Sequence, residues 1–330
     1  MLFLETLVVL RLFVDLCITI EKMQKSFQTT LSEPVNFEGV GLHSGINSQI
    51  RILPAEANQG IIFKRTDIKN KNNIIYANFK RVTSTKLCTK LENEAGVKVS
   101  TVEHLLAALY FSGIDNVIIE IDAEEVPIMD GSAKKFLDIL NSSTIKSLPV
   151  KRKFLKILNK VEINDGEKKI SIEPNNDSLE VEFHLDYHNK VIGKQKNIID
   201  FQKDNLNEVT ESRTFCLYKD IKKIKKIGLA KGGSLDNAIV VDDNRVLNDG
   251  GLRNEKEFVN HKILDLAGDF ILSGYRILGK VKCYQGGHEL TNLFLRNLLD
   301  KKSDYTLIKL NDKKLPKIKQ NIFSEVALNV

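Results

Sequence analysis

The feature of this sequence that most restricts its fold is an order of elements that occurs twice. In each half, a helical run carrying a histidine leads into a glycine, then a strand, then a turn that begins a last helix. The interval from His104 to Asp130 at the first turn nearly equals the interval from His261 to His288 at the second. Such repetition indicates two similarly built units. We therefore predict a weak internal duplication whose equivalent helices face each other across an interface, where sites often form.

Strands and helices do not alternate strictly along the chain, which favours α+β layers over a doubly wound parallel sheet. Runs rich in β-branched and aromatic residues predict strands at 61–63, 117–121, 179–185 and 238–241. Apolar periodicity predicts helices at 101–110, 132–140, 257–272 and 290–299.

The boundary between the two units is expected at 141–153, which contains a Ser-Ser pair, Pro149 and a Lys/Arg run. It separates domain I (23–145) from domain II (146–300), and a Lys-rich tail follows at 301–330. The tail is expected to be a solvated end, with contact to anionic lipid headgroups as the alternative. The 330 residues suit two domains of roughly 150 each.

The segment 1–22 has two interpretations. The run 1–20 is mostly apolar but contains Glu5, Arg11 and Asp15. A membrane-spanning helix is not expected, because one charge near the middle of a span costs about 2.5–3.5 kcal/mol. A secretory signal is not expected either, because no basic start or small-residue cleavage site is present. Either translation starts at Met23 or the segment 1–22 forms an amphipathic surface helix.

The charge balance restricts the partners of the chain. Its 49 Lys and Arg exceed its 43 Asp and Glu, which gives a net charge of +6. This modest excess suits an anionic small molecule or an acidic membrane surface and falls short of a nucleic-acid binder. The four cysteines form no CxxC pair, so we expect a protein of the reducing cytoplasm.

Two histidine motifs suggest metal chemistry. His261 and Asp265 are four residues apart and share one helix face, so both can reach one ion; the alternative is a solvated polar pair. His104 is a candidate third ligand, and Glu103 would then reach a water beside the ion and take its proton. The alternative is a capping box in which Ser100 and Glu103 cap the helix and His104 is structural. Two histidines and one carboxylate with an open position are typical of catalytic zinc.

Two further motifs suggest proton transfer and oxyanion binding. His288 follows two glycines at a helix start and either caps that helix or, kept protonated by Asp269, donates a proton to a leaving amine. The polar run 211–215 is either a strand-end turn or a part of the site. In the second case Thr214 and Lys262 would stabilise an oxyanion.

Eight ordered stretches, which together cover about 23–299, resemble one family. They are 39–45 (GVGLHSG), 100–105 (STVEHL), 126–132 (VPIMDGS), 212–215 (SRTF), 232–234 (GGS), 238–243 (AIVVDD), 259–265 (VNHKILD) and 287–288 (GH). The chain is similar to the UDP-3-O-acyl-N-acetylglucosamine deacetylases, zinc amidases of lipid A synthesis in Gram-negative bacteria. Any one stretch is a weak signal, whereas the ordered set is highly specific.

The resemblance implies two similar α+β domains, each a β-sheet layered on helices, with the active site between them. It implies zinc-dependent hydrolysis of the N-acetyl group of the UDP-linked acylated glucosamine, which releases acetate and the free glucosamine derivative. One Zn²⁺ per chain is expected, with iron as the alternative. The implied metal ligands are His104, His261 and Asp265. The implied catalytic residues are Glu103 as base, His288 as acid oriented by Asp269, and Thr214 and Lys262 as oxyanion and substrate contacts.

The family also has a small insert in domain II that forms an apolar passage for the 3-O-acyl chain, here about 215–243. The implied passage residues, whose alternative is ordinary core packing, are Phe215, Leu217, Ile221, Ala230, Ser234 and Val240. Tyr187 resembles the residue that stacks on uracil. Gln285 departs from the basic residue of several relatives, which puts one diphosphate contact in doubt.

The implied partner is the UDP-sugar, with no nucleic acid. The chain is expected to be a cytoplasmic monomer, with peripheral contact to the inner membrane as an added expectation. Two rival functions remain at this point. One is a different metal-dependent amidohydrolase on the same scaffold, and the other is a non-enzymatic nucleotide- or RNA-binding module.

Overall fold

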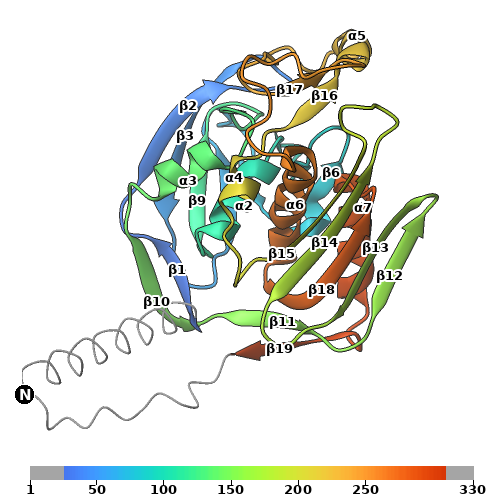
Figure 1. The fold of residues 1–330 in the computed structure, drawn as a ribbon. Coiled ribbons are helices and arrows are strands. Elements are labelled where there is room, and N and C mark those ends of the chain that lie inside the picture. The colour runs from blue at the N-terminus through green and yellow to red at the C-terminus, as the bar shows by residue number, and fades with distance from the viewer. Residues whose placement is uncertain (1–25, 310–330) are drawn as a thin grey trace, which may run out of the picture.

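The computed structural model describes residues 26–309 (Figure 1). The predictions for 1–22 and for most of the Lys-rich tail therefore lie outside the described residues. The fold has two main sheets with helices packed between and beside them, which confirms the predicted α+β class. No helix within residues 26–309 has the length and apolar character needed to span a bilayer.

The first sheet has five strands in the order β2-β3-β9-β4-β5. Its central strand β9 pairs antiparallel with β3 and parallel with β4. Burial alternates along β3, as expected for a strand with one face on a core. The helices of this half are α2 (Glu103–Phe111) and α3 (Lys134–Leu140). The strands are β2 (Val35–Val40), β3 (Asn47–Pro54), β4 (Ile61–Arg65), β5 (Ile74–Tyr76) and β9 (Val117–Ile121).

The second sheet has seven strands, and its central strand is β18 (Arg276–Tyr284). This strand pairs parallel with β11 and β14 and antiparallel with β13. The helices of this half are α4 (Asn207–Glu211), α6 (Glu257–Phe270) and α7 (His288–Asp300). The other strands are β11 (Lys153–Ile157), β12 (Val161–Asp165), β13 (Lys168–Pro174), β14 (Leu179–Asp186), β15 (Lys194–Asp200) and β19 (Tyr305–Lys309).

Smaller elements connect or extend the two sheets. A parallel pair, β16 (Phe215–Leu217) and β17 (Ile239–Val241), carries the exposed helix α5 (Tyr218–Lys226) at one end of the molecule (Figure 1). The rest are β1 (Phe27–Leu31), β10 (Ile145–Lys151), β6 (Val82–Ser84), β7 (Lys90–Glu92), β8 (Lys98–Val99) and the 3₁₀ turns η1 (Phe79–Arg81) and η2 (Ile271–Ser273).

Two segments differ in structure from their sequence-based description. The proposed boundary at 141–153 is mostly strand, because β10 pairs with β1 before the chain enters β11. The proposed tail begins as β19, which pairs antiparallel with β11. Both segments satisfy their backbone hydrogen bonds in ladders rather than in water. The division into domains at 145/146 stays a proposal.

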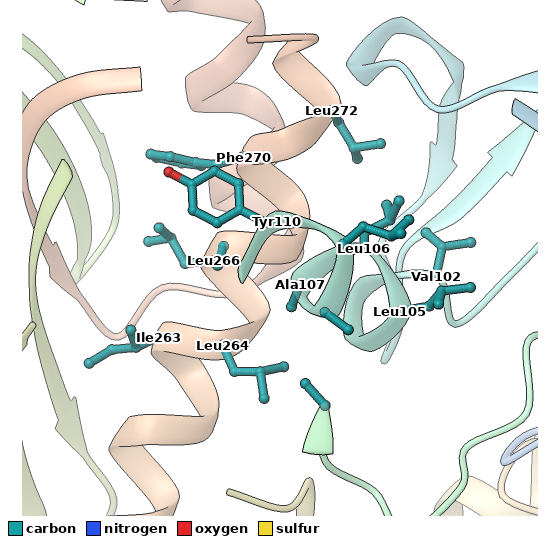
Figure 2. Close-up of a cluster of buried hydrophobic side chains, with 14 of the residues drawn as sticks. Val102, Leu105, Leu106, Ala107, Tyr110, Ile263, Leu264, Leu266, Phe270 and Leu272 are labelled. Carbon is teal, nitrogen blue, oxygen red and sulfur yellow. The ribbon is translucent and has the colours of Figure 1, made fainter. Parts of the chain in front are cut away.

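The molecule is built around the crossing of α2 and α6, the two helices that carry the predicted histidines. Every residue of α2 from Glu103 to Tyr110 is buried, as is typical of a central helix that is apolar all round. Figure 2 shows the side chain of Tyr110 from α2 beside Leu266 and Phe270 of α6, while Leu106 lies on the side of Leu272. Full burial of one such large side chain contributes about 1.5–3 kcal/mol.

A glycine sets how closely the two helices cross. A Cβ atom placed on Gly268 of α6 would lie 2.0 Å from the backbone oxygen of Glu103, the first residue of α2. No side chain fits in that space. The glycine therefore brings the start of α2, with its Glu103-His104 pair, against the middle of α6.

A buried ionic cluster joins the two halves on the other side of this crossing. Asp115 follows α2, and its Oδ2 accepts a hydrogen bond of 2.7 Å from Nη2 of Arg152. Its Oδ1 lies 3.5 Å from Nε of Arg276, at the start of β18. Arg276 also donates from Nη1 to the carbonyl oxygen of Tyr110 and covers that ring. One carboxylate thus holds two guanidinium groups from the second half.

Candidate active site

The two histidine helices bring three metal-binding side chains to one point. Nε2 of His261 lies 3.3 Å from Oδ1 of Asp265, one turn along α6. Nε2 of His104, from α2, lies 3.6 Å from the same oxygen. All three side chains are buried, and their candidate ligand atoms lie within 4.8 Å of one another. The expected convergence of His104, His261 and Asp265 is therefore present.

The capping-box alternative for 100–104 is wrong. Helix α2 starts at Glu103, and the residue before it is Val102, which makes no side-chain cap hydrogen bond. The hydroxyl of Ser100 donates instead to the carbonyl oxygen of Glu124. Thr101 has a φ of 55°, so the chain turns sharply into the helix. The carboxylate of Glu103 is consequently available to the site rather than used as a cap.

The three side chains fit a divalent metal ion. Nδ1 of His261 lies 3.1 Å from the carbonyl oxygen of Ser212, which can accept its proton and leave the Nε2 lone pair facing the cluster. Burial lowers the pKa of His261 to about 3, so the ring is neutral, as a metal ligand must be. Oδ1 of Asp265 is buried and accepts no hydrogen bond from any residue in 26–309. A buried carboxylate oxygen without a partner is costly, and a cation removes that cost.

The ionisation of Asp265 supports the same conclusion. Burial by itself raises the pKa of this carboxyl, but the neighbouring His261 and Lys262 outweigh burial and hold the pKa well below its usual range. Nζ of Lys262 lies 2.9 Å from Oδ2 of Asp265. The carboxylate is thus anionic, with Oδ2 bonded to lysine and Oδ1 left for an ion.

Glu103 and His288 face each other beside this cluster. Oε1 of Glu103 is 3.7 Å from Nε2 of His288, the first residue of α7. Burial raises the pKa of Glu103, although His288 and His104 oppose that rise. Burial alone would lower the pKa of His288, but the carboxylates of Asp269 and Glu103 raise it to about 10. The pair therefore consists of an imidazolium and a carboxylate whose affinity for a proton is increased.

Asp269 lies where the sequence placed it, one turn beyond Asp265 on α6. Its Oδ2 is 2.9 Å from Nδ1 of His288, a hydrogen bond that fixes the ring orientation. The signal for this contact was the helical spacing of Asp265 and Asp269 together with the glycine turn before His288.

Thr89 is a part of the site that sequence reasoning missed. Its backbone N–H donates to Oε2 of Glu103 at 3.0 Å, and its hydroxyl donates to Oδ1 of Asp269 at 2.7 Å. One buried threonine thus orients both carboxylates that contact His288. No signal in the sequence could have found it, because it lies just before the short strand β7 and far from either helix motif.

Lys262 and Thr214 lie on the side of the cluster that faces the 215–243 segment. Burial lowers the pKa of Lys262, but Asp265 outweighs burial and the pKa is raised, so the side chain is charged. Nζ of Lys262 lies 5.4 Å from the ring centroid of Phe215, the residue after Thr214. The backbone of Thr214 is held between Gly131 and Ile239, since it donates to the first and accepts from the second.

The close contact at Gly131 explains a glycine in the VPIMDGS stretch. Gly131 has a φ of +84°, and a Cβ there would lie 2.2 Å from the carbonyl oxygen of Asn237. A side chain would therefore push this turn away from the loop before β17 that contains Asn237.

Two cavities adjoin the cluster. The first has a volume of about 410 Å³, lies under α5 and is lined mostly by apolar side chains, with Thr214 and His43 at its wall. Five of the six predicted passage residues line it: Phe215, Ile221, Ala230, Ser234 and Val240. The second is a cleft of about 810 Å³ lined by Lys262, His288 and Tyr187. Leu217, the sixth predicted passage residue, lines this cleft and not the first cavity.

The side chain of Gln285 is held at the edge of the cleft. Its Nε2 donates to the carbonyl oxygen of Asp186 at 2.6 Å, and its backbone has a φ of 54°. This residue adds no positive charge to the cleft, and the diphosphate contact stays in doubt.

Comparisons with known proteins agree with this geometry. The family model for UDP-3-O-acyl N-acetylglycosamine deacetylase matches residues 28–300. The UDP-3-O-acyl-N-acetylglucosamine deacetylase of Pasteurella multocida (strain Pm70) is 44% identical over 289 residues, which cover 87% of this chain and 94% of that protein. The proteins of the same name from Aliivibrio fischeri (strain ATCC 700601 / ES114) and Campylobacter fetus subsp. fetus (strain 82-40) are 45% identical over 275 residues and 41% over 288. These matches cover 82% and 87% of this chain and 90% and 96% of the relatives. The fold, the buried His-His-Asp group and these similarities together show that the chain belongs to the UDP-3-O-acyl-N-acetylglucosamine deacetylase family.

Proposed function

We propose that this chain hydrolyses the N-acetyl group of UDP-3-O-acyl-N-acetylglucosamine and releases acetate and UDP-3-O-acyl-glucosamine, a step of lipid A biosynthesis. The observation that carries the proposal is the placement of Glu103 and His288, 3.7 Å apart, beside three metal-binding side chains. Amide hydrolysis needs such an arrangement, because one group removes a proton from water and another supplies one to the amine.

Zinc is the proposed ion, one per chain, held by His104, His261 and Asp265. Two histidines and one carboxylate are a donor set that catalytic zinc uses, and iron can occupy the same set. When bound, the ion supplies a Lewis acid that polarises the amide carbonyl and lowers the pKa of a water.

Glu103 is the proposed general base. Its Oε2 is held by the N–H of Thr89, so Oε1 is the atom that faces His288 and is free to take a proton. The effect of burial, which raises the pKa of this carboxyl, increases its affinity for the proton it removes from water.

His288 is the proposed general acid. Its Nδ1 is bonded to Asp269, so the proton it can give is on Nε2, the atom that faces Glu103. The raised pKa keeps that proton in place at neutral pH until the departing 2-amino group accepts it. Lys262 and Thr214 are the proposed contacts for the negative charge that develops on the carbonyl oxygen.

The two cavities suit the two ends of this substrate. The apolar cavity under α5 is proposed to hold the 3-O-acyl chain, and the cleft lined by Tyr187 is proposed to hold the uridine diphosphate. We propose that the protein acts as a cytoplasmic monomer. All the proposed catalytic and binding groups come from one chain, so the reaction needs no residue from a second copy.

A deacetylation assay with the purified wild type and two variants tests the proposal. Glu103→Ala and His288→Ala should each retain the metal, because neither residue is among the three proposed ligands, and should lose most turnover. A roughly 10²–10⁴-fold loss is expected for removal of a general acid or base. A near-normal rate in either variant would remove that residue from its role. A panel of acylated sugars that lack the nucleotide distinguishes the rival amidohydrolase, which would accept them equally well.

A further inference from the structure

Helix α5 presents a strongly positive face at one end of the molecule. It lies beyond β16 and β17, away from the body of both sheets (Figure 1). Its nine residues include five lysines and one aspartate, which leaves a charge of +4. All five lysines are exposed, and none of them forms an ion pair with a carboxylate of residues 26–309. This charge therefore faces solvent unneutralised.

Apolar side chains are exposed beside the same helix. Tyr218 is 58% exposed, Ile227 is 53% exposed and Leu235 is 47% exposed. A single exposed apolar residue is ordinary, but two of these three, Tyr218 and Leu235, lie around one cavity. Tyr218 and Leu235 line the apolar cavity under α5, and so do Ile221 and Ile224 on the inner side of the helix. The inner face of α5 thus covers the cavity, while Lys222, Lys223 and Lys226 are exposed and line neither the cavity nor the cleft.

We propose that this end of the molecule docks on the surface of an anionic phospholipid bilayer through Lys222, Lys223 and Lys226, with Ile227 and Leu235 in the headgroup region. Each lysine near an anionic surface contributes about 1 kcal/mol, and apolar residues beside them add partitioning into the interface. The purpose of this docking rests on the proposed function. The cavity proposed to hold the acyl chain would open at the membrane surface, where acyl chains are found.

The arrangement favours a bilayer over a nucleic acid or an acidic protein. Nucleic-acid surfaces that bind single strands interleave aromatic side chains with lysines, whereas here only Tyr218 is aromatic and it lines the cavity. Exposed lysines beside exposed apolar side chains suit an anionic bilayer surface, which attracts the charges and admits the apolar groups.

Flotation of the full chain with lipid vesicles tests the proposal. The wild type should bind phosphatidylcholine vesicles that contain phosphatidylglycerol, should not bind pure phosphatidylcholine, and should dissociate as salt is raised. The triple variant Lys222→Glu, Lys223→Glu, Lys226→Glu should bind at least about 100-fold more weakly, as three lysines of about 1 kcal/mol each imply. Absent wild-type binding, or unchanged binding of the variant, would overturn the proposal.

A matched variant in the C-terminal tail separates this surface from the other lysine-rich segment. Lys313→Glu, Lys314→Glu and Lys317→Glu make the same change in charge and should leave vesicle binding near the wild-type level. If the tail variant loses binding and the α5 variant keeps it, the tail is the docking element and the inference is wrong.

Turnover measured without vesicles keeps this inference distinct from the proposed chemistry. None of the three α5 lysines contacts the metal cluster or lines either cavity, so the α5 variant should deacetylate soluble substrate at the wild-type rate. A reduced rate in solution would show that these lysines act on the substrate and would overturn a docking role. An inactive wild type that still binds anionic vesicles would refute the proposed function and leave the docking surface standing.

Discussion

Replacing Gly268 by alanine tests how the crossing of α2 and α6 builds the metal site. In most helix interiors the change from glycine to alanine stabilises the fold by roughly 0.5–1 kcal/mol. Here the added Cβ would lie 2.0 Å from the oxygen of Glu103 and 2.8 Å from its carbonyl carbon, and both are backbone atoms. Ordinary van der Waals contact begins at 3.4 Å, so the two helices would have to separate by more than an ångström.

A displacement of this size exceeds what the metal site can tolerate. It carries Glu103 and His104 away from His261 and Asp265, whereas metal–ligand distances tolerate about 0.2 Å. Misplacement of catalytic groups by about 1 Å costs about 10²-fold in rate. Overpacking a core costs about 1–3 kcal/mol, which exceeds the gain in helix propensity. We therefore expect Gly268→Ala to be less stable by about 1–2 kcal/mol, to bind metal weakly and to lose activity.

Chelator competition and urea unfolding measure these effects. Gly287→Ala is a suitable control, because its φ of −168° is extended and its Cβ would meet no atom within 4 Å. The control should keep wild-type stability and metal affinity. Wild-type metal affinity in Gly268→Ala, together with raised stability, would refute the argument that this glycine sets the site.

Four further predictions concern the protonation of His288, the hydroxyl of Thr89, the apolar cavity under α5 and the ionic cluster around Asp115. In metal-free protein the raised pKa of His288 stabilises the fold fully below about pH 6.5, and this contribution disappears as the pH rises through about 10; urea midpoints should fall over that range, and less so in Asp269→Asn. Thr89→Val should keep its metal and its backbone hydrogen bond to Glu103 but lose about tenfold in turnover, with a shifted pH profile that Thr89→Ser restores, since a hydrogen bond to a charged group is worth about 1.5–3 kcal/mol. Ile221→Asp should lower kcat/KM for long-acyl substrates and spare short-acyl ones, which a substrate series would show. Asp115→Ala leaves two buried guanidinium groups without their carboxylate and should lower the free energy of unfolding by about 3–5 kcal/mol. A change below about 1 kcal/mol would contradict the stabilising role of this ionic cluster.

The helices and strands that the sequence predicted are those with strong local patterns. The histidine helices were predicted within a few positions of their ends, because their apolar periodicity reflects burial between two sheets. The strand at 145–151 was not predicted, since its partner β1 lies near the start of the described chain and its own residues read as polar. Such a segment becomes a strand because it pairs with a strand far away in the sequence, and sequence periodicity does not reveal that pairing.

The site was predictable where one helix carries several of its groups. His261, Asp265 and Asp269 follow helical spacing, so their common face could be read directly from the sequence. Thr89 could not, because its contacts depend on how a loop of the first half meets α6. The failed capping box at Ser100 has a related cause: a residue with positive φ at Thr101 delays the helix start to Glu103.

The central claim is that His104, His261 and Asp265 hold one catalytic ion. Metal analysis of the wild type, purified without added metal, beside His261→Ala tests it most directly. We expect close to one zinc per wild-type chain, its loss in the variant, and deacetylase activity that follows the metal content. A wild type that binds no metal even when zinc is supplied, or a variant that retains it in full, would contradict the claim.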